Sequence, residues 1–276
     1  MEIQQQKIKW VKTWQTAELS LKNIKRNELQ AFDYYEKNRI LLDEMLQYAC
    51  DNSKKSLFSG LAEQQRIFEK MHKNKNIKER QQTMNSLFQA ALELQHTMKS
   101  QNWPFCFIGG LAVIRWGEVR MTQDIDLCLM CGFGNEEAYI ENLIKQYKSR
   151  IEEPVNFALS NRVLLLSASN GVSVDISLSG LPFEEEMIRK ATPFKFSPDC
   201  SLITCSAEDL IVLKAFADRP KDWNDVETIA MRQENKLNIE YITEHLTPLC
   251  DLKESPEIVE KLKKALRKKD NSQANN

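Results

Sequence analysis

The feature that most constrains the fold is an apolar run that ends in two glycines, followed by a second apolar run that opens with alternating carboxylates. The first run is FCFIGG at residues 105–110, and the second is DIDL at residues 124–127. In a β-strand, residues i and i+2 point to the same face, so Asp124 and Asp126 project together while the apolar residues face the other side. The pattern therefore predicts a buried strand with two carboxylates on one face.

Two carboxylates this close repel one another unless a cation lies between them. Hard oxygen ligands suit Mg²⁺, which usually completes its coordination with waters and substrate phosphates. Gly109 and Gly110 allow the backbone to approach such phosphates closely, with the N-terminus of the following helix facing the anion. The two runs together predict a magnesium site that binds a nucleotide, with a plain glycine turn as the alternative for the two glycines.

A third acid lies on another predicted strand. The apolar run at residues 163–166 and the alternating run at residues 172–176 are separated by Asn170-Gly171, which is a strong hairpin signal. Asp175 belongs to the second of these strands. We expect it to join the other two acids, although an acid after a hairpin can also serve as a cap or face solvent.

Composition places the chain among ordinary globular proteins. It has 276 residues, of which 42% are hydrophobic and 28% are charged, which excludes wholesale disorder. No apolar run approaches the roughly 18 residues that span a bilayer, and the polar N-terminus lacks a signal-peptide core. We expect a cytoplasmic protein with no membrane partner.

Cysteine and histidine usage limits the possible chemistry. The seven cysteines are an odd number and lie mostly in apolar segments, which favours reduced, buried thiols. Cys128 and Cys131 form a lone C-x-x-C, for which a zinc or redox role is the alternative. With only three histidines and no G-x-S-x-G motif, histidine-based hydrolysis is not expected.

The pattern of elements indicates two domains. Residues 1–78 are predicted to form a small helical accessory domain, and the polar stretch 73–80 is the best candidate for a linker. Residues 1–80 are basic, with 16 Lys and Arg against 11 Asp and Glu. Residues 79–276 alternate strands and helices, which predicts an α/β (α+β) fold with a mixed sheet flanked by helices. The expected helices include those near residues 84–98, 111–116, 206–217, 222–232, 239–246 and 256–268.

The Gly-Gly turn, the Asp-x-Asp strand and a later strand with one acid resemble the nucleotidyltransferase superfamily. Within it, Arg120-x-Thr122-x-Asp124-Ile125-Asp126-Leu127 and Lys214-x4-Arg219-x-Lys221-Asp222-x2-Asp225 look like the AbiEii/AbiGii-type toxins and their minimal relatives. The resemblance covers roughly residues 80–250.

The resemblance implies an enzyme that moves a nucleoside monophosphate from a nucleoside triphosphate to an acceptor hydroxyl. Asp124, Asp126 and Asp175 would hold Mg²⁺, and Asp175 would help to deprotonate the acceptor. The remaining implied positions are catalytic Lys214 and nucleotide-binding Gly109, Gly110, Arg120, Thr122, Lys221, Asp222 and Asp225. For Lys214 to Asp225, an ordinary salt-bridged helix surface is the alternative.

The acceptor and the partners remain open at this stage. The resemblance fits three kinds of acceptor, namely RNA (with tRNA among the candidates), a protein or a small molecule. It also fits a toxin of a toxin–antitoxin or abortive-infection system. Residues 1–78 would then act as an antitoxin in cis, meet a separate antitoxin, or deliver nucleic acid through their basic surface. The alternative function is a non-catalytic nucleotide-binding or protein-interaction module.

Overall fold

The computed structural model of the chain describes residues 13, 17, 20–27, 86–118 and 122–267. These residues divide into two compact units, of which the larger holds residues 13, 17, 86–118 and 122–267 and the smaller holds the helical residues 20–27. The predicted domain boundary near residue 78 and most of the predicted helical domain lie outside the described residues. Two domains split at residue 78 therefore stay a prediction.

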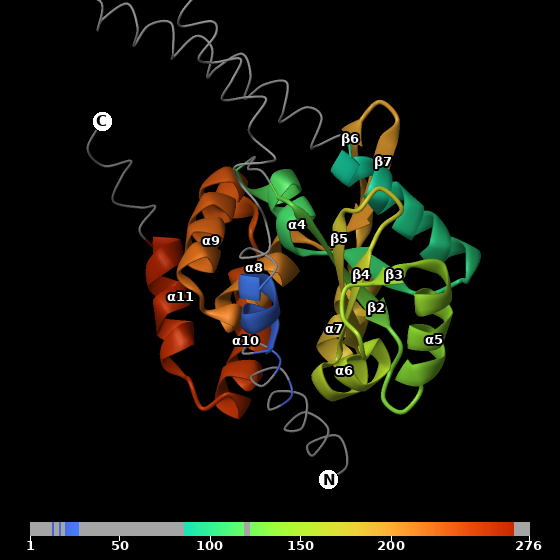
Figure 1. Cartoon of the computed structure of the whole chain (residues 1–276). Coiled ribbons are helices and arrows are strands. Elements are labelled where there is room, and N and C mark those ends of the chain that lie inside the picture. Colours follow the sequence, from blue (N-terminus) through green and yellow to red (C-terminus); the bar gives the residue numbers. More distant parts are fainter. Residues whose placement is uncertain (1–12, 14–16, 18–19, 28–85, 119–121, 268–276) are drawn as a thin grey trace, which may run out of the picture. The chain divides into compact units, whose positions relative to one another are not determined.

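From residue 86 onward, the larger unit consists of a helix over residues 86–100 and then an alternation of strands and helices (Figure 1). Its strands are β1 (Phe105–Phe107), β2 (Asp124–Met130), β3 (Lys148–Ser149), β4 (Val163–Ser167), β5 (Ser173–Ser179), β6 (Thr192–Ser197) and β7 (Cys200–Thr204). Its helices are α4 (Gly109–Trp116), α5 (Glu136–Gln146), α6 (Pro154–Asn161), α7 (Pro182–Lys190), α8 (Ala207–Ala217), α9 (Pro220–Gln233), α10 (Ile239–Leu252) and α11 (Glu257–Arg267), with a 3₁₀ turn at Glu234–Lys236.

The strands form one seven-stranded sheet in the order β3-β4-β5-β2-β1-β7-β6. β2 runs parallel to β5 and β1 runs parallel to β7, whereas the other neighbours are antiparallel. The sheet is therefore mixed and is flanked by helices, which confirms the predicted fold class. The predicted strands at residues 105–108, 125–130, 163–166 and 172–176 are all present within a few residues.

The hairpin predicted from Asn170-Gly171 joins β4 to β5. Gly171 takes a φ of +82°, which an L side chain rarely adopts, and its N–H donates to the carbonyl oxygen of Ala168 at 2.9 Å. The side-chain oxygen of Asn170 accepts from the Val172 N–H at 3.2 Å. This tight turn sets the register of β4 against β5 and thereby the position of Asp175.

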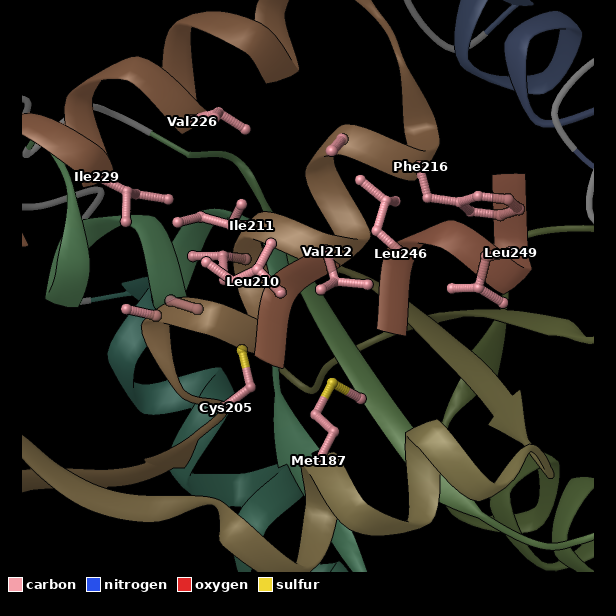
Figure 2. Packing of buried hydrophobic residues seen from close by; sticks show 14 of the residues in the cluster. Met187, Cys205, Leu210, Ile211, Val212, Phe216, Val226, Ile229, Leu246 and Leu249 are labelled. Carbon is pink, nitrogen blue, oxygen red and sulfur yellow. The ribbon is translucent and has the colours of Figure 1, made fainter. Parts of the chain in front are cut away.

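The core gathers around α8, which is apolar on nearly every side. Leu210, Ile211 and Phe216 of α8 pack against buried residues of α7, α9 and α10 (Figure 2). Full burial of an aliphatic or aromatic side chain contributes about 1.5–3 kcal/mol each relative to exposure. Cys128 belongs to the same cluster, so this core extends onto the face of β2 that also carries Asp124 and Asp126.

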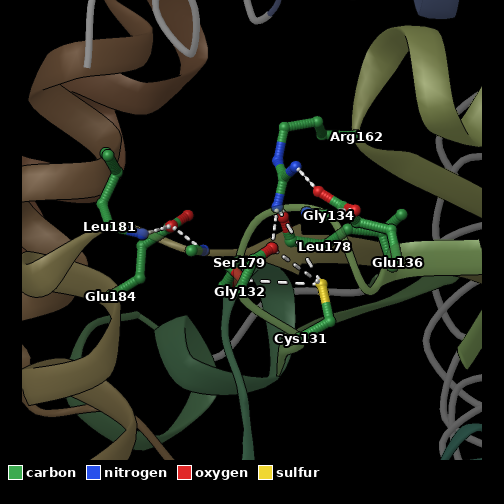
Figure 3. A network of polar contacts seen from close by, with 10 residues as sticks. Cys131, Gly132, Gly134, Glu136, Arg162, Leu178, Ser179, Leu181 and Glu184 are labelled. Atoms are coloured by element: carbon green, nitrogen blue, oxygen red, sulfur yellow. Dashed lines mark hydrogen bonds and ion pairs between the residues drawn. The ribbon is translucent and has the colours of Figure 1, made fainter. Parts of the chain in front are cut away.

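Arg162 fixes the opposite end of β2. It ends α6 with a φ of +54°, donates to the carbonyl oxygens of Leu178 and Gly132 at 2.9 Å each, and pairs with Glu136 (Figure 3). Glu136 also accepts from the Gly134 N–H at 2.7 Å. The loop after β2 is thereby tied to the end of β5, away from the acids at the start of β2.

The two cysteines of the C-x-x-C motif lie near the end of β2 that is opposite the acids. Cys128 and Cys131 are free, buried thiols, as are the other cysteines in the described part of the chain. Burial raises the pKa of Cys131 to about 12 and raises that of Cys128 further. Thiols that stay protonated are poor nucleophiles and poor metal ligands, which supports the buried, reduced state expected from the sequence.

Among the helices that the structure describes, none combines the length and the apolar character needed to cross a bilayer.

Candidate functional site

Three carboxylates lie on one face of the sheet, at the start of β2 and in β5. Asp126 of β2 is the direct register partner of Asp175 of β5, and Asp124 pairs with Ser173. Directly opposite residues of neighbouring strands project to the same face, so Asp126 and Asp175 project side by side. All three acids are half-buried, while the residues that alternate with them, Ile125 and Val174, are fully buried. Asp175 thus lies on a strand beside the other two acids, as expected.

The environment of Asp175 is crowded with negative charge. Its Oδ1 atom lies 2.5 Å from Nη1 of Arg150. Burial and then the charge of Asp126 nevertheless raise the pKa of Asp175 to about 6, against the lowering effect of Arg150. Asp124 adds to the same effect. Arg150 therefore does not offset the combined effect of burial and the two neighbouring carboxylates on the pKa of Asp175.

This raised pKa predicts a distinctive pH dependence of stability. Between the ordinary pKa of an unfolded aspartate and about 6, the folded protein binds more protons at Asp175 than the unfolded chain, so stability falls as the pH rises through this window. Asp175→Asn resembles the protonated acid and removes this dependence. Without metal, we expect the variant to unfold like the wild type near about pH 4 and to be roughly 2–3 kcal/mol more stable near about pH 7.5. Urea unfolding at both pH values measures this, and parallel pH curves for the two proteins would contradict the assignment.

Gly109 brings the backbone into contact with Asp126. Its φ is +55°, and a Cβ atom at this position would lie 1.8 Å from Oδ2 of Asp126. The N–H of Ile108 also donates to the Asp126 carbonyl oxygen at 3.0 Å. Only glycine leaves room for the carboxylate here, so the Gly-Gly turn and the acids form one site.

Replacing Gly109 with alanine tests this packing. We expect Gly109→Ala to lose about 2–4 kcal/mol of unfolding free energy, since it adds overpacking against Asp126 to the strain of a positive φ. Gly171→Ala is the matched control, because Gly171 also has a positive φ but has nothing within 4 Å of the added Cβ. It should lose only about 1 kcal/mol. Chemical denaturation compares the two, and equal losses would show that Asp126 does not occupy the space at Gly109.

Thr122 lies against Gly110 and supports Asp124. Its hydroxyl donates to Oδ1 of Asp124 at 3.0 Å, and the threonine is almost fully buried. A Cβ atom at Gly110 would lie 2.3 Å from the Thr122 hydroxyl oxygen. Both glycines are therefore required by close contacts, one with Asp126 and one with the residue that orients Asp124.

The donor set fits Mg²⁺, although the ligands are not gathered around a single point. The three carboxylates supply hard oxygen ligands. In the described part of the chain, no three His, Cys, Asp or Glu side chains are arranged so as to hold a metal ion. Asp175 bonds to Arg150, and Asp124 accepts from Thr122. Coordination of one ion by all three acids would therefore need a rearrangement of these carboxylates.

The second predicted group of site residues forms a buried ion-pair network between α8 and α9. Nζ of Lys214 lies 3.0 Å from Asp222 and 2.8 Å from Asp225, and Arg219 lies 2.5 Å from Asp222. Residue exposure is 7% for Lys214, 0% for Asp222 and 2% for Asp225. Burial alone would raise the pKa of Asp222, but the hydrogen bond from Arg219 and the charge of Lys214 hold that pKa below its usual value. The salt bridges of the alternative interpretation are therefore present, but these three residues are buried and do not lie on a helix surface.

The structure does not place every predicted residue at the carboxylates. Lys214 pairs with Asp222 and Asp225, and Lys221 lies exposed in the first turn of α9. Arg120 lies outside the described residues. The sequence interpretation also missed Arg150, which follows β3 and reaches Asp175. No local pattern marks this arginine, since its role depends on the pairing of β3, β4 and β5.

Comparisons with known proteins found one matching family and several similar solved structures. The sequence model of one family, described as "Nucleotidyltransferase of unknown function (DUF6036)", matches residues 82–264. No curated protein matches the chain. Similar solved structures include an antigenic nucleotidyltransferase-like protein from Paracoccidioides brasiliensis, with 16% identity, 66% of this chain and 94% of that chain covered, and a TM-score of 0.39.

Two further solved structures are of ANT(2'')-Ia. A solution structure of this antibiotic-resistance factor has 18% identity, covers 69% of this chain and 96% of that chain, and gives a TM-score of 0.36. A crystal structure in complex with adenylyl-2''-tobramycin has 19% identity, covers 67% and 98%, and gives a TM-score of 0.32.

Proposed function

The chain belongs to this nucleotidyltransferase family, and we propose that it transfers a nucleoside monophosphate from a nucleoside triphosphate to an acceptor hydroxyl. The observation that carries the proposal is the contact of Gly109 with Asp126, next to Asp175. It joins a turn suited to phosphates with three carboxylates suited to a divalent cation. This combination favours transfer of a phosphoryl group over nucleotide binding without catalysis.

The triphosphate would lie against the turn between β1 and α4. α4 begins at Gly109, so its N-terminal N–H groups favour negative charge, and Asp126 and Thr122 pack directly against this turn. Asp124 and Asp126 would hold Mg²⁺, which neutralises and orients phosphate oxygens when bound. Thr122 keeps the Asp124 carboxylate in position through its hydroxyl.

Asp175 is suited to accept the acceptor's proton. As the acceptor oxygen forms its bond to the α-phosphorus, the bond between that phosphorus and the bridging oxygen breaks, and the electron pair leaves with pyrophosphate. The hydroxyl proton passes to a carboxylate oxygen of Asp175. With a pKa near 6, Asp175 is ionised at neutral pH yet more basic than an ordinary aspartate.

The remaining predicted residues have supporting roles in the proposal. Arg120 and Lys221 would neutralise phosphate charge. For Lys214 we now favour a structural role, because its contacts are with Asp222 and Asp225, which join α8 to α9. α8 and α9 both pack against α4, so this network would hold the helix that begins at the Gly-Gly turn.

Two finer proposals concern the type of enzyme. The motifs around Thr122 and Lys221 support an AbiEii/AbiGii-type toxin, and residues 1–78 would act as a domain that restrains it or as the docking site of an antitoxin. Inducible expression of residues 79–276 should then arrest growth at least as strongly as expression of the full chain, and the Asp124→Asn/Asp126→Asn variant of residues 79–276 should not. Equal growth of the cultures that express residues 79–276 with and without the two substitutions, at equal protein levels, would contradict the toxin role.

Pyrophosphate release tests the proposed reaction. The purified chain with Mg²⁺ and each of ATP, CTP, GTP and UTP should release pyrophosphate when bulk RNA, protein extract or small-molecule extract supplies the acceptor. The preferred triphosphate and the productive extract define the substrates. Release that does not depend on any acceptor fraction, or that is the same for Asp124→Asn/Asp126→Asn, would contradict the proposal.

A further inference from the structure

Arg150 reaches across a whole strand to contact Asp175. Its backbone N–H continues the pairing of β3 with β4 by donating to the Leu165 carbonyl oxygen at 3.1 Å, and Leu165 is in turn the register partner of Asp175. Because neighbouring strands lie about 4.8 Å apart, the backbones of Arg150 and Asp175 lie about 10 Å apart, and the two side chains together span this gap. Its position is therefore set by the register of three strands.

This arginine lies on a defined side of the carboxylates. Across the sheet, β3, β4 and β5 lie to one side of β2, and β1 lies to the other. The Gly-Gly turn follows β1, whereas Arg150 follows β3. Asp126 and Asp175 thus stand between an anion-binding turn on the β1 side and a guanidinium on the β5 side.

The geometry of nucleotidyl transfer assigns these two sides to different substrates. The attacking and leaving oxygens lie roughly in line through the α-phosphorus. If the triphosphate lies against Gly109 and Gly110, pyrophosphate departs on the β1 side and the acceptor hydroxyl enters on the β5 side. Arg150 therefore faces the acceptor.

We propose that Arg150 sets the acceptor class by binding a phosphate that the acceptor carries close to its reacting hydroxyl. This inference rests on the proposed function. The 3′ end of an RNA strand and a nucleoside 5′-monophosphate both have this chemistry. A guanidinium is a planar fork of N–H donors that matches phosphate oxygens, so it can contact a phosphate and a carboxylate together.

The contact with Asp175 supports this role. The Arg150 side chain is only 11% exposed and that of Asp175 is 27% exposed, so the guanidinium is held in one place beside the proposed base. A guanidinium fixed there offers its N–H donors to a phosphate in a defined position. The same contact brings the bound phosphate close to the residue that takes the hydroxyl proton.

The test compares acceptors that differ only in phosphate. Wild type, Arg150→Met and Arg150→Lys are assayed with the triphosphate that the wild type prefers, and with a short RNA, a nucleoside 5′-monophosphate, the nucleoside without phosphate, and an amino sugar. We expect Arg150→Met to raise KM for the phosphate-bearing acceptors about 10- to 100-fold, with KM for the triphosphate nearly unchanged. Arg150→Lys should recover part of the loss. The phosphate-bearing acceptor with the higher kcat/KM identifies whether the source is RNA or a free nucleotide.

A matched variant separates a specific site from general charge attraction. Lys145→Met removes an exposed cation of α5, five positions earlier, and should leave every KM unchanged. Thermal unfolding shows whether each variant is folded. Three results would overturn the role of Arg150 while leaving the nucleotidyltransferase activity intact. The first is that Lys145→Met raises the acceptor KM as much as Arg150→Met does, and the second is that Arg150→Met raises KM for the triphosphate as much as KM for the acceptor. The third is that the wild type uses the nucleoside equally well with and without its phosphate. A folded wild type that transfers to no acceptor would overturn the proposed function as well.

Discussion

Replacing Asp126 with asparagine is expected to lower nucleotidyl transfer by more than about 100-fold while the protein stays folded. Loss of residues that only support metal ligands typically costs 10- to 100-fold, so loss of a direct ligand should cost more. Asparagine has the same size as aspartate, and it removes a negative charge that raises the pKa of Asp175. The unfolding free energy at neutral pH should therefore not decrease. Initial rates of labelled monophosphate transfer and urea unfolding measure the two quantities.

Asp199→Asn is the control for this experiment. Asp199 is exposed between β6 and β7, so the substitution makes the same change of charge on the same sheet without touching the carboxylates. We expect its rate to equal that of the wild type. If Asp126→Asn retains more than about a tenth of the wild-type rate, the carboxylate pair does not hold the catalytic metal.

Replacing Lys214 with methionine should cause one of the largest losses of stability in the chain, about 3–5 kcal/mol. Methionine approximately preserves the length of the side chain but removes the cation that lies 3.0 Å from Asp222 and 2.8 Å from Asp225. Two buried carboxylates then lose their shared cation in an environment of low dielectric constant. Chemical denaturation at neutral pH measures the loss.

An exposed lysine provides the comparison for Lys214. Lys263 pairs with Glu260 at 2.7 Å on the surface of α11, where the two side chains are 42% and 66% exposed. Lys263→Met should cost less than about 1 kcal/mol. A Lys214→Met variant that unfolds like the wild type but loses transfer activity would contradict the structural role and support the catalytic role that the sequence predicts.

The carboxylate site could be predicted from the sequence because each of its parts corresponds to a short local sequence pattern. Alternation in β2 places Asp124 and Asp126 on one face, and Asn170-Gly171 fixes the hairpin that carries Asp175. The two glycines signalled a close backbone approach, which the structure explains by contacts with Asp126 and Thr122. Each of these inferences needs only the periodicity of a strand or the geometry of a turn.

Other features depend on pairings between distant segments, which a single sequence does not reveal. Arg150 reaches Asp175 only because β3, β4 and β5 are neighbours. Strand β6 was not predicted, because Pro193 argues against a strand inside a sheet. The structure places β6 at the edge of the sheet, where a proline and exposed residues are tolerated. The burial of Lys214 arises because α9 folds back on α8, which charge spacing alone does not distinguish from an exposed ion pair.

The fate of the phosphates tests the central claim most directly. The chain is incubated with Mg²⁺, an acceptor extract and the preferred triphosphate, labelled at the α-phosphate in one reaction and at the γ-phosphate in another. We predict that the α-label becomes attached to the acceptor while the γ-label leaves as pyrophosphate, and that Asp124→Asn/Asp126→Asn shows neither. Transfer of the γ-label to the acceptor, or retention of the α-label on free nucleotide with every acceptor fraction, would contradict nucleotidyl transfer.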